Sequence, residues 1–167
     1  MTGSEQWIRD LQLRRHPEGG WFREIYRAEE TIPRRSLPAR FGGSRAYSTA
    51  IYFLLEGSEF SALHRLRQDE LWHFYEGDAL TIHSIDPAGS HTIRVLGRRI
   101  DAGESLVVVV SAGHWVGAVV EPGRYALVGC TVAPGFEFED FEMPDRDELL
   151  NRFPDHRTII ERLTRSP

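Results

Sequence analysis

Glycine and proline interrupt this chain so often that a fold built on long helices is not expected. The 167 residues include 15 glycines and 9 prolines, spread along the whole length. Between them lie short apolar or alternating runs, and strands recurring every ~8–12 residues are typical of an all-β sandwich or barrel. The runs predict nine strands, at residues 20–27, 46–55, 61–67, 70–76, 79–85, 91–96, 105–110, 115–120 and 125–132.

Helices are expected only near the two ends. Residues 4–13 form one candidate, with Ser4 as its N-cap. Residues 146–153 and 156–163 carry apolar side chains at helical spacing. The polar segment 29–44, rich in Pro, Arg and Gly, predicts a long surface loop that serves either as a lid or as a plain connection.

The length is that of one ordinary domain, so we expect a single domain over residues 1–167, with its core at about 20–140 and a helical tail at about 145–165. A net charge of −5 gives no general attraction to nucleic acid or to acidic membranes. We see neither a membrane-spanning window nor a signal peptide, so a cytoplasmic protein is expected. All 20 basic residues are arginine, which excludes lysine-based covalent catalysis.

The densest group of polar side chains lies between Gly57 and Gly77. Residues two apart in a strand share a face, so His64 and Leu66 face one way. On the next strand Glu70, Trp72 and Phe74 share a face. A short loop lets His64 and Glu70 meet, either as an acid–base pair, as half of a metal site, or as a structural hydrogen bond.

The spacing from His64 to Glu70 and on to Gly77 resembles the first conserved motif of the cupin superfamily, and residues 111–116 stand at the second. Further stretches resemble the cupin-5 family of uncharacterised proteins, also called DUF985. They are HPEGGWFREIY from His16, STAIYFLL from Ser48, ELWHFY from Glu70, AGHW from Ala112 and VAPGFEFEDF from Val132. The resemblance implies an RmlC-like jelly-roll β-sandwich or barrel with short N- and C-terminal helices. It also implies a homodimer, because cupins commonly pair.

The sequence departs from the cupins at two positions that bind metal in that superfamily. Metal-binding cupins hold Mn, Fe, Ni or Zn with three histidines and one carboxylate. Here Leu66 and Val116 stand where the second and third histidines belong. We therefore expect no cofactor, while His64, Glu70 and His114 remain as the set that could rebuild a site for a divalent metal.

The resemblance extends distantly to the dTDP-sugar 3,5-epimerases, which use a barrel histidine as base and a tyrosine as acid without a metal. His64 matches that histidine in position, and Tyr52 and Tyr75 are the candidate acids. The expected catalytic residues are therefore these three with Glu70. The expected substrate-binding residues are Trp72, Phe74, His73, Trp115, His114 and Arg23.

Three classes of function stay open at this point, and whether the chain is an enzyme is one of the open questions. The first is a metal-independent isomerase, epimerase or lyase that acts on a sugar, a sugar nucleotide or a hydroxy acid, with His64 as the acid–base. The second is a cupin that binds a small molecule without changing it. The third is a metal-dependent enzyme. The expected partner in each case is a small polar molecule.

Overall fold

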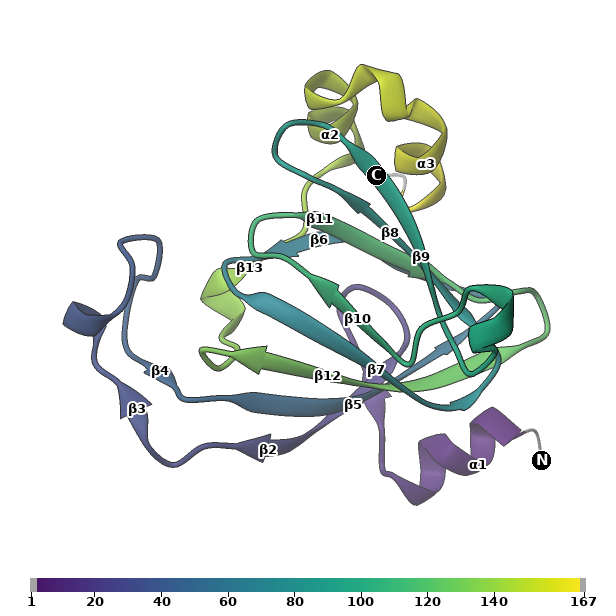
Figure 1. Cartoon of the computed structure of the whole chain (residues 1–167), viewed down its shortest axis with the longest axis horizontal. Coiled ribbons are helices and arrows are strands. Elements are labelled where there is room, and N and C mark those ends of the chain that lie inside the picture. The colour runs from purple at the N-terminus through teal and green to yellow at the C-terminus, as the bar shows by residue number, and fades with distance from the viewer. Residues whose placement is uncertain (1–2, 166–167) are drawn as a thin grey trace.

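Two antiparallel sheets face each other in the computed structural model, which describes residues 3–165 (Figure 1). The strands of the six-stranded sheet lie in the order β1-β2-β5-β12-β7-β10, and those of the five-stranded sheet in the order β13-β6-β11-β8-β9. Neither sheet closes on itself, so the architecture is an open jelly-roll sandwich. The first sheet contains β1 (Arg14–Arg15), β2 (Trp21–Arg27), β5 (Thr49–Glu56), β7 (Asp69–Gly77), β10 (Val107–Val110) and β12 (Tyr125–Ala133). The second contains β6 (Phe60–Leu66), β8 (Leu80–Ile85), β9 (His91–Leu96), β11 (Trp115–Val119) and β13 (Phe141–Glu142).

The predicted all-β class and the predicted strands are confirmed. The predicted segment 46–55 is divided, because its first residue belongs to the short ribbon of β3 (Thr31–Ile32) and β4 (Arg45–Ala46). The terminal helices are α1 (Gly3–Asp10), α2 (Arg146–Arg152) and α3 (Arg157–Arg162). Short 3-10 turns are η1 (Arg34–Ser36), η2 (Ile100–Ala102), η3 (Phe138–Asp140) and η4 (Pro154–His156). None of the helices within residues 3–165 is long and apolar enough to span a membrane.

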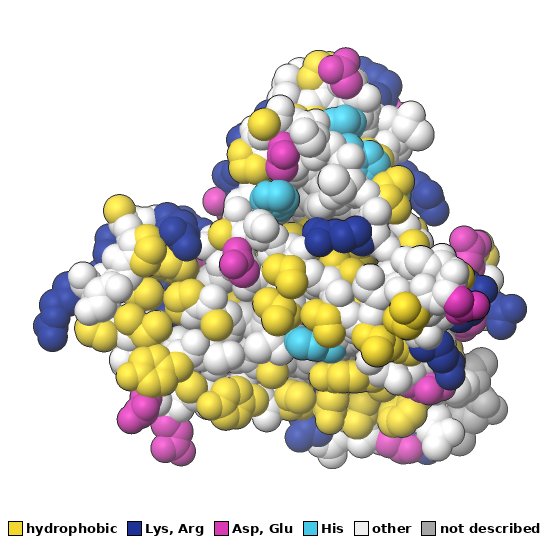
Figure 2. Space-filling model, in the orientation of Figure 1, with side chains coloured by type: hydrophobic (Ala, Val, Ile, Leu, Met, Phe, Trp, Pro, Cys, Tyr) yellow, Lys and Arg dark blue, Asp and Glu magenta, His cyan; other side chains and the backbone are white. Residues whose placement is uncertain are grey.

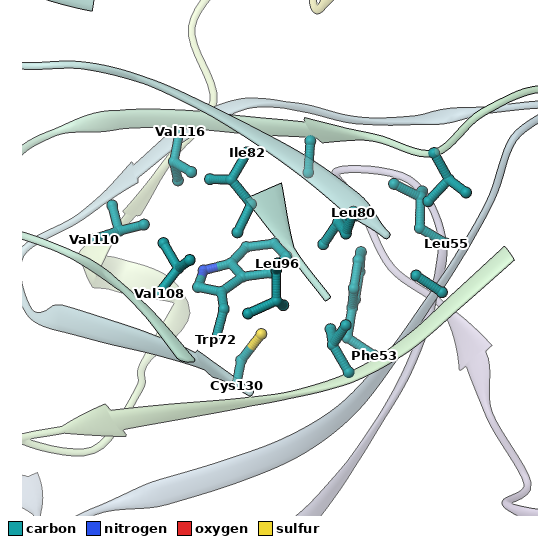
Figure 3. Close-up of a cluster of buried hydrophobic side chains, with 14 of the residues drawn as sticks. Phe53, Leu55, Trp72, Leu80, Ile82, Leu96, Val108, Val110, Val116 and Cys130 are labelled. Carbon is teal, nitrogen blue, oxygen red and sulfur yellow. The ribbon is translucent and has the colours of Figure 1, made fainter. Parts of the chain in front are cut away.

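The hydrophobic core fills the space between the two sheets. Alternation along each strand turns one face inward, so Phe53 and Cys130 from the first sheet meet Ile82 and Val116 from the second (Figure 3). Trp72 lies at the centre and is only 1% exposed. Among single side chains, one of this size makes a comparatively large hydrophobic contribution to stability when buried.

Helices cover part of each outer face. α2 and α3 pack on the five-stranded sheet, where Leu149 and Ile160 meet Leu63 and Trp115 (Figure 1). α1 packs on the six-stranded sheet over Leu54. The rest of that outer face is open and apolar, and hydrophobic side chains gather along the lower part of the view in Figure 2. Exposed residues there include Ile25, Tyr26, Tyr75, Val107 and Val109.

The segment predicted as a loop, residues 29–44, forms an arm that extends away from the sandwich (Figure 1). A buried ion pair fastens the base of this arm. Arg45, in β4, donates two hydrogen bonds of 2.7 and 2.8 Å to Asp140, and the two side chains are 1% and 0% exposed. Gln68, in the turn between β6 and β7, donates a further hydrogen bond of 2.7 Å to Asp140. Asp140 therefore connects the base of the arm, this turn and η3.

Replacing Asp140 with Asn is expected to lower the free energy of unfolding by about 3 kcal/mol, because Arg45 loses its buried counter-charge and keeps only the exposed Glu139 carboxylate, 2.6 Å away. Urea denaturation measures the loss. The matched control is Glu142→Gln, which removes the exposed ion pair with Arg65 and should cost only about 0–1 kcal/mol. Equal effects of the two substitutions would contradict the anchoring role of Asp140.

Candidate functional site

A cavity of about 160 Å³ lies between the sheets, at the end where β13 meets β6. At ~30 Å³ per liquid water, it has room for about five waters or a small organic molecule. Half of its lining residues are apolar, and the phenylalanines among them are Phe22, Phe53, Phe136, Phe138 and Phe141. Its polar lining divides into a buried acid–base cluster and an exposed rim. The cluster consists of His16, Glu18, His64 and Glu70, and the rim of Arg14, Glu24, Arg27 and Glu137.

Strand alternation places His64 and Glu70 in the cavity, as expected from their spacing. His64 projects inward from β6 beside Leu66, which also lines the cavity. Glu70 projects inward from β7 in the opposite sheet. His64 and Leu66 therefore share the inner face of β6, as expected. His64 and Glu70 reach the same cavity from the two opposite sheets.

A glycine turn brings the third member, Glu18, into the same space. The turn is closed by backbone hydrogen bonds between His16 and Gly20 and between Gly19 and His16. Gly19 has φ of +111°, and a Cβ there would collide with the carbonyl oxygen of Phe60. Only glycine fits this position, and the turn it permits buries the Glu18 side chain beneath the cavity.

Hydrogen bonds fix the tautomer of His64. Its Nδ1 lies 2.7 Å from the carbonyl oxygen of Ala62, which can only accept, so Nδ1 carries the proton. Nε2 therefore holds the free lone pair in the neutral ring, and it lies 3.2 Å from the Glu18 carboxyl. Burial lowers the pKa of His64, while the nearby Glu70 opposes this shift. His64 is thus a neutral imidazole whose basic nitrogen faces an acid.

Glu18 is a protonated acid at neutral pH. Burial raises its pKa to about 8, although the hydrogen bond of 2.9 Å from the Ser61 hydroxyl works against the shift. A protonated Glu18 donates to Nε2 of His64, so the two groups share one proton. His16 completes the cluster: its Nδ1 accepts a hydrogen bond from the Glu18 backbone, and burial lowers its pKa to about 3. The neutral His16 ring therefore keeps a proton on Nε2, for which the described residues offer no acceptor.

Glu70 is the second titratable acid of the cavity. Burial raises its pKa to about 7, opposed mainly by the nearby His64. One carboxyl oxygen accepts a hydrogen bond of 2.9 Å from the indole nitrogen of Trp72. The Cys130 thiol lies beside the same carboxyl, and burial raises the pKa of that thiol. Glu70 is thus half ionised near neutral pH, the condition under which a carboxyl both gives and takes protons effectively.

The side chains do not suit the metal site that the cupin resemblance implies. Within residues 3–165 no group of three or more His, Cys, Asp or Glu side chains is arranged to hold a metal ion. Leu66 and Val116 occupy two ligand positions, and Val116 lies directly across from His64 in the sheet. The set of His64, Glu70 and His114 is not brought together, because His114 lies outside the cavity lining and near Asp86.

The two tyrosines expected as proton donors do not line the cavity. Ile51 and Phe53 point inward from β5, so Tyr52 between them points outward. Tyr75 shares the outward face of β7. The two rings meet edge to face on the outside of the sheet, with centroids 6.1 Å apart. The candidate acid is therefore not a tyrosine at this cavity.

Most of the expected substrate-binding residues also lie elsewhere. Trp115 is buried beneath α2 and α3, and Phe74 packs at another part of the core. His73 faces outward, 3.1 Å from the Thr131 hydroxyl. Arg23 bonds the chain segment that follows α1. Trp72 is the exception in part, because it reaches the site through its hydrogen bond to Glu70.

Sequence reasoning missed Glu18 and Arg14 and left the role of His16 undecided. These residues lie in or next to a turn before β2, where strand alternation gives no direction for a side chain. The available signal was the run His16-Pro-Glu-Gly-Gly, in which paired glycines surround polar residues. Such a run indicates a tight turn that can carry a functional side chain.

The chain resembles known proteins both in sequence and in structure. Residues 5–144 match the family Cupin_5, described as Cupin superfamily (DUF985). A crystal structure of a protein from Shewanella oneidensis is 37% identical, with a TM-score of 0.89 and 100% of both chains covered. A hypothetical protein from Leishmania major is 32% identical, with a TM-score of 0.90 over 99% of this chain and 100% of that chain. Among curated proteins, none matches.

A more distant structural likeness concerns the fold alone. Oxalate decarboxylase from Bacillus subtilis is 16% identical, with a TM-score of 0.55 over 89% of this chain and 36% of that chain.

The buried acids predict an unusual dependence of stability on pH. Glu18 and Glu70 hold protons in the folded protein up to pKa values of about 8 and 7, whereas the unfolded chain releases them near 4.5. The folded state therefore binds more protons, and the free energy of unfolding should fall by about 2 kcal/mol from pH 6.5 to 8. Below 6.5 the neutral His16 has the opposite effect, because the unfolded chain takes up its proton.

Urea denaturation at a series of pH values measures this slope. Glu18→Gln and Glu70→Gln should each flatten it between pH 6.5 and 8, whereas Glu104→Gln should leave it unchanged, because the pKa of Glu104 is lowered rather than raised. A wild-type stability that stays level or rises over this range would contradict the assignment.

Proposed function

The chain belongs to the Cupin_5 (DUF985) family of the cupin superfamily, and from its cavity we propose a metal-independent enzyme that moves protons on a small polar molecule. The reaction class is an isomerisation, epimerisation or lyase reaction on a sugar-like or hydroxy-acid substrate. One observation carries the proposal: two separate acid–base units, Glu70 and the Glu18–His64 pair, line one small cavity. Pairs of buried titratable groups with shifted pKa values are typical of catalytic sites.

The proposed steps use both units. Glu70, as a carboxylate, takes a proton from the carbon next to a carbonyl group of the substrate, and the electron pair of that C–H bond moves to form an enediol or enol. The proton shared by Glu18 and His64 passes to the carbonyl oxygen, so no free oxyanion accumulates. Glu70 then returns its proton to the same or a neighbouring carbon while an enol oxygen gives a proton back to the Glu18–His64 pair, which yields the epimer or isomer and restores both acid–base units. His64 thus works as an acid–base together with Glu18, and Trp72 orients Glu70.

The cavity volume limits the substrate. A space of about 160 Å³ admits a small molecule but not a whole nucleotide, so the part of the substrate that reacts is of small-acid or single-sugar size. The aromatic walls exclude bulk water from the buried acids, which strengthens their electrostatic effect on a bound substrate.

Hydrogen exchange provides a test that does not depend on which product is formed. In D2O, with a chelator present, the protein should replace the hydrogen next to the carbonyl group of a small 2-oxo acid or ketose with deuterium, followed by NMR. His64→Gln and Glu70→Gln should each reduce the exchange rate by about 10²–10⁴-fold. His83→Gln is the control, because His83 bonds His91 outside the cavity.

Three outcomes would overturn the proposal. Exchange that stops with chelator and returns with added Mn, Fe, Ni or Zn would indicate a metal enzyme. Exchange that survives both cavity substitutions would place the chemistry elsewhere. Ligands that bind in the cavity of the wild-type protein without any exchange would indicate a binding protein rather than an enzyme.

A further inference from the structure

The rim of the cavity carries two arginines, and the protein already uses one of them. Arg27 donates hydrogen bonds of 3.0 and 2.9 Å to Glu24 and one of 2.8 Å to Glu137. Another of its N–H groups reaches the carbonyl oxygen of Phe136. These bonds occupy the guanidinium group of Arg27, and they also occupy both carboxylates of the rim. Arg27 therefore holds the rim together and is not free to bind a ligand.

Arg14 is in the opposite situation. It is exposed, lines the cavity, and makes no ion pair with any carboxylate of residues 3–165. Its guanidinium lies over the ring of Phe22, 5.0 Å from the ring centroid. Stacking on a ring leaves the N–H donors of an arginine unused, and their planar arrangement matches the two oxygens of a carboxylate.

The position of Arg14 sets the size of a ligand that spans the site. Arg14 and Phe22 are paired across β1 and β2, and the Phe22 ring in turn contacts the His16 ring at a centroid distance of 4.5 Å. A ligand held by Arg14 therefore passes along one phenyl ring before it reaches the buried cluster. There the free Nε2–H of His16 is a donor for an oxygen of the ligand.

We propose that Arg14 is the anchor for the carboxylate of the substrate, which is a small monocarboxylic acid. Its apolar or aromatic middle part lies against Phe22 and Phe138, and its reactive end reaches His64 and Glu70. This inference rests on the proposed function, because it assigns the substrate class of the same cavity. It also predicts charge selectivity: Arg27 with its two carboxylates carries one net negative charge, which Arg14 balances, so one anionic group of a ligand is accommodated and a second is disfavoured.

Binding of a matched pair of probes tests the anchor without requiring turnover. Phenylacetate and phenylacetamide have the same shape and differ in charge, and titration of the whole protein by calorimetry or ligand-detected NMR measures both. Phenylacetate should bind at least 10-fold more tightly than the amide and than the dianion phenylsuccinate. Arg14→Gln should weaken phenylacetate binding by about 10–100-fold and leave the amide unchanged. Arg14→Lys should retain part of the preference.

The neighbouring residue supplies the control. Arg15 stacks on Trp21 and is already paired with Glu59 at 2.6 Å, so Arg15→Gln should not change phenylacetate binding. Equal binding of acid and amide, no binding of either, or an Arg14→Gln variant that binds as well as wild type would each overturn the anchor. Failure here leaves the deuterium exchange of ketoses as a separate test of the proposed function, so the two ideas can fail independently.

Discussion

The buried contact between Arg45 and Asp140 sets the outer wall of the cavity. These two charges are almost fully removed from water, and each of their short hydrogen bonds joins segments that are far apart in the chain. Asp140 lies in the segment that carries Phe136, Phe138 and Phe141, so the ion pair holds three aromatic side chains over the cavity. The arginine fork matches a carboxylate in one orientation only, which gives this wall a defined position.

The acid–base cluster also consists of buried polar groups, but within residues 3–165 its carboxyl groups form no ion pair with an arginine as Asp140 does. Three elements supply its four members: the glycine turn for His16 and Glu18, one sheet for His64 and the facing sheet for Glu70. Burying an ionised carboxyl group costs stability, and burial accordingly raises the pKa of Glu18 to about 8 and that of Glu70 to about 7. Near neutral pH the cavity therefore holds one acid that is mostly protonated, Glu18, and one that is half ionised, Glu70.

The sequence was informative wherever strand alternation applies. It predicted the main strands, the terminal helices, and the placement of His64 and Glu70 on the inner faces of their strands, because all of these follow from local periodicity. It was not informative for Glu18 and Arg14. The direction of the Glu18 side chain is set by a turn, and Arg14 lies in a strand of only two residues, which is too short to show alternation. The sequence did not show whether the Tyr52 side chain points into the sandwich or out of it. The structure shows that its neighbours Ile51 and Phe53 point inward, so Tyr52 points outward.

Arg23 and Trp115 illustrate a further limit. Both have side chains suited to ligand binding, but tertiary packing uses them elsewhere: Arg23 bonds the backbone after α1, and Trp115 lies under the C-terminal helices. Periodicity gives the face of a strand that a side chain occupies. It does not tell whether that face meets a cavity, a helix or solvent.

The hydrogen bond from Trp72 to Glu70 gives the site an optical signal of its own. The indole nitrogen lies 2.9 Å from a carboxyl oxygen, and the ring is shielded from solvent. Gain or loss of a proton at that carboxyl changes the electric field across the indole, and a field in a buried environment is weakly screened. The near-ultraviolet absorbance and emission of this tryptophan therefore follow the ionisation of Glu70, and the occupancy of the cavity becomes visible without an added label.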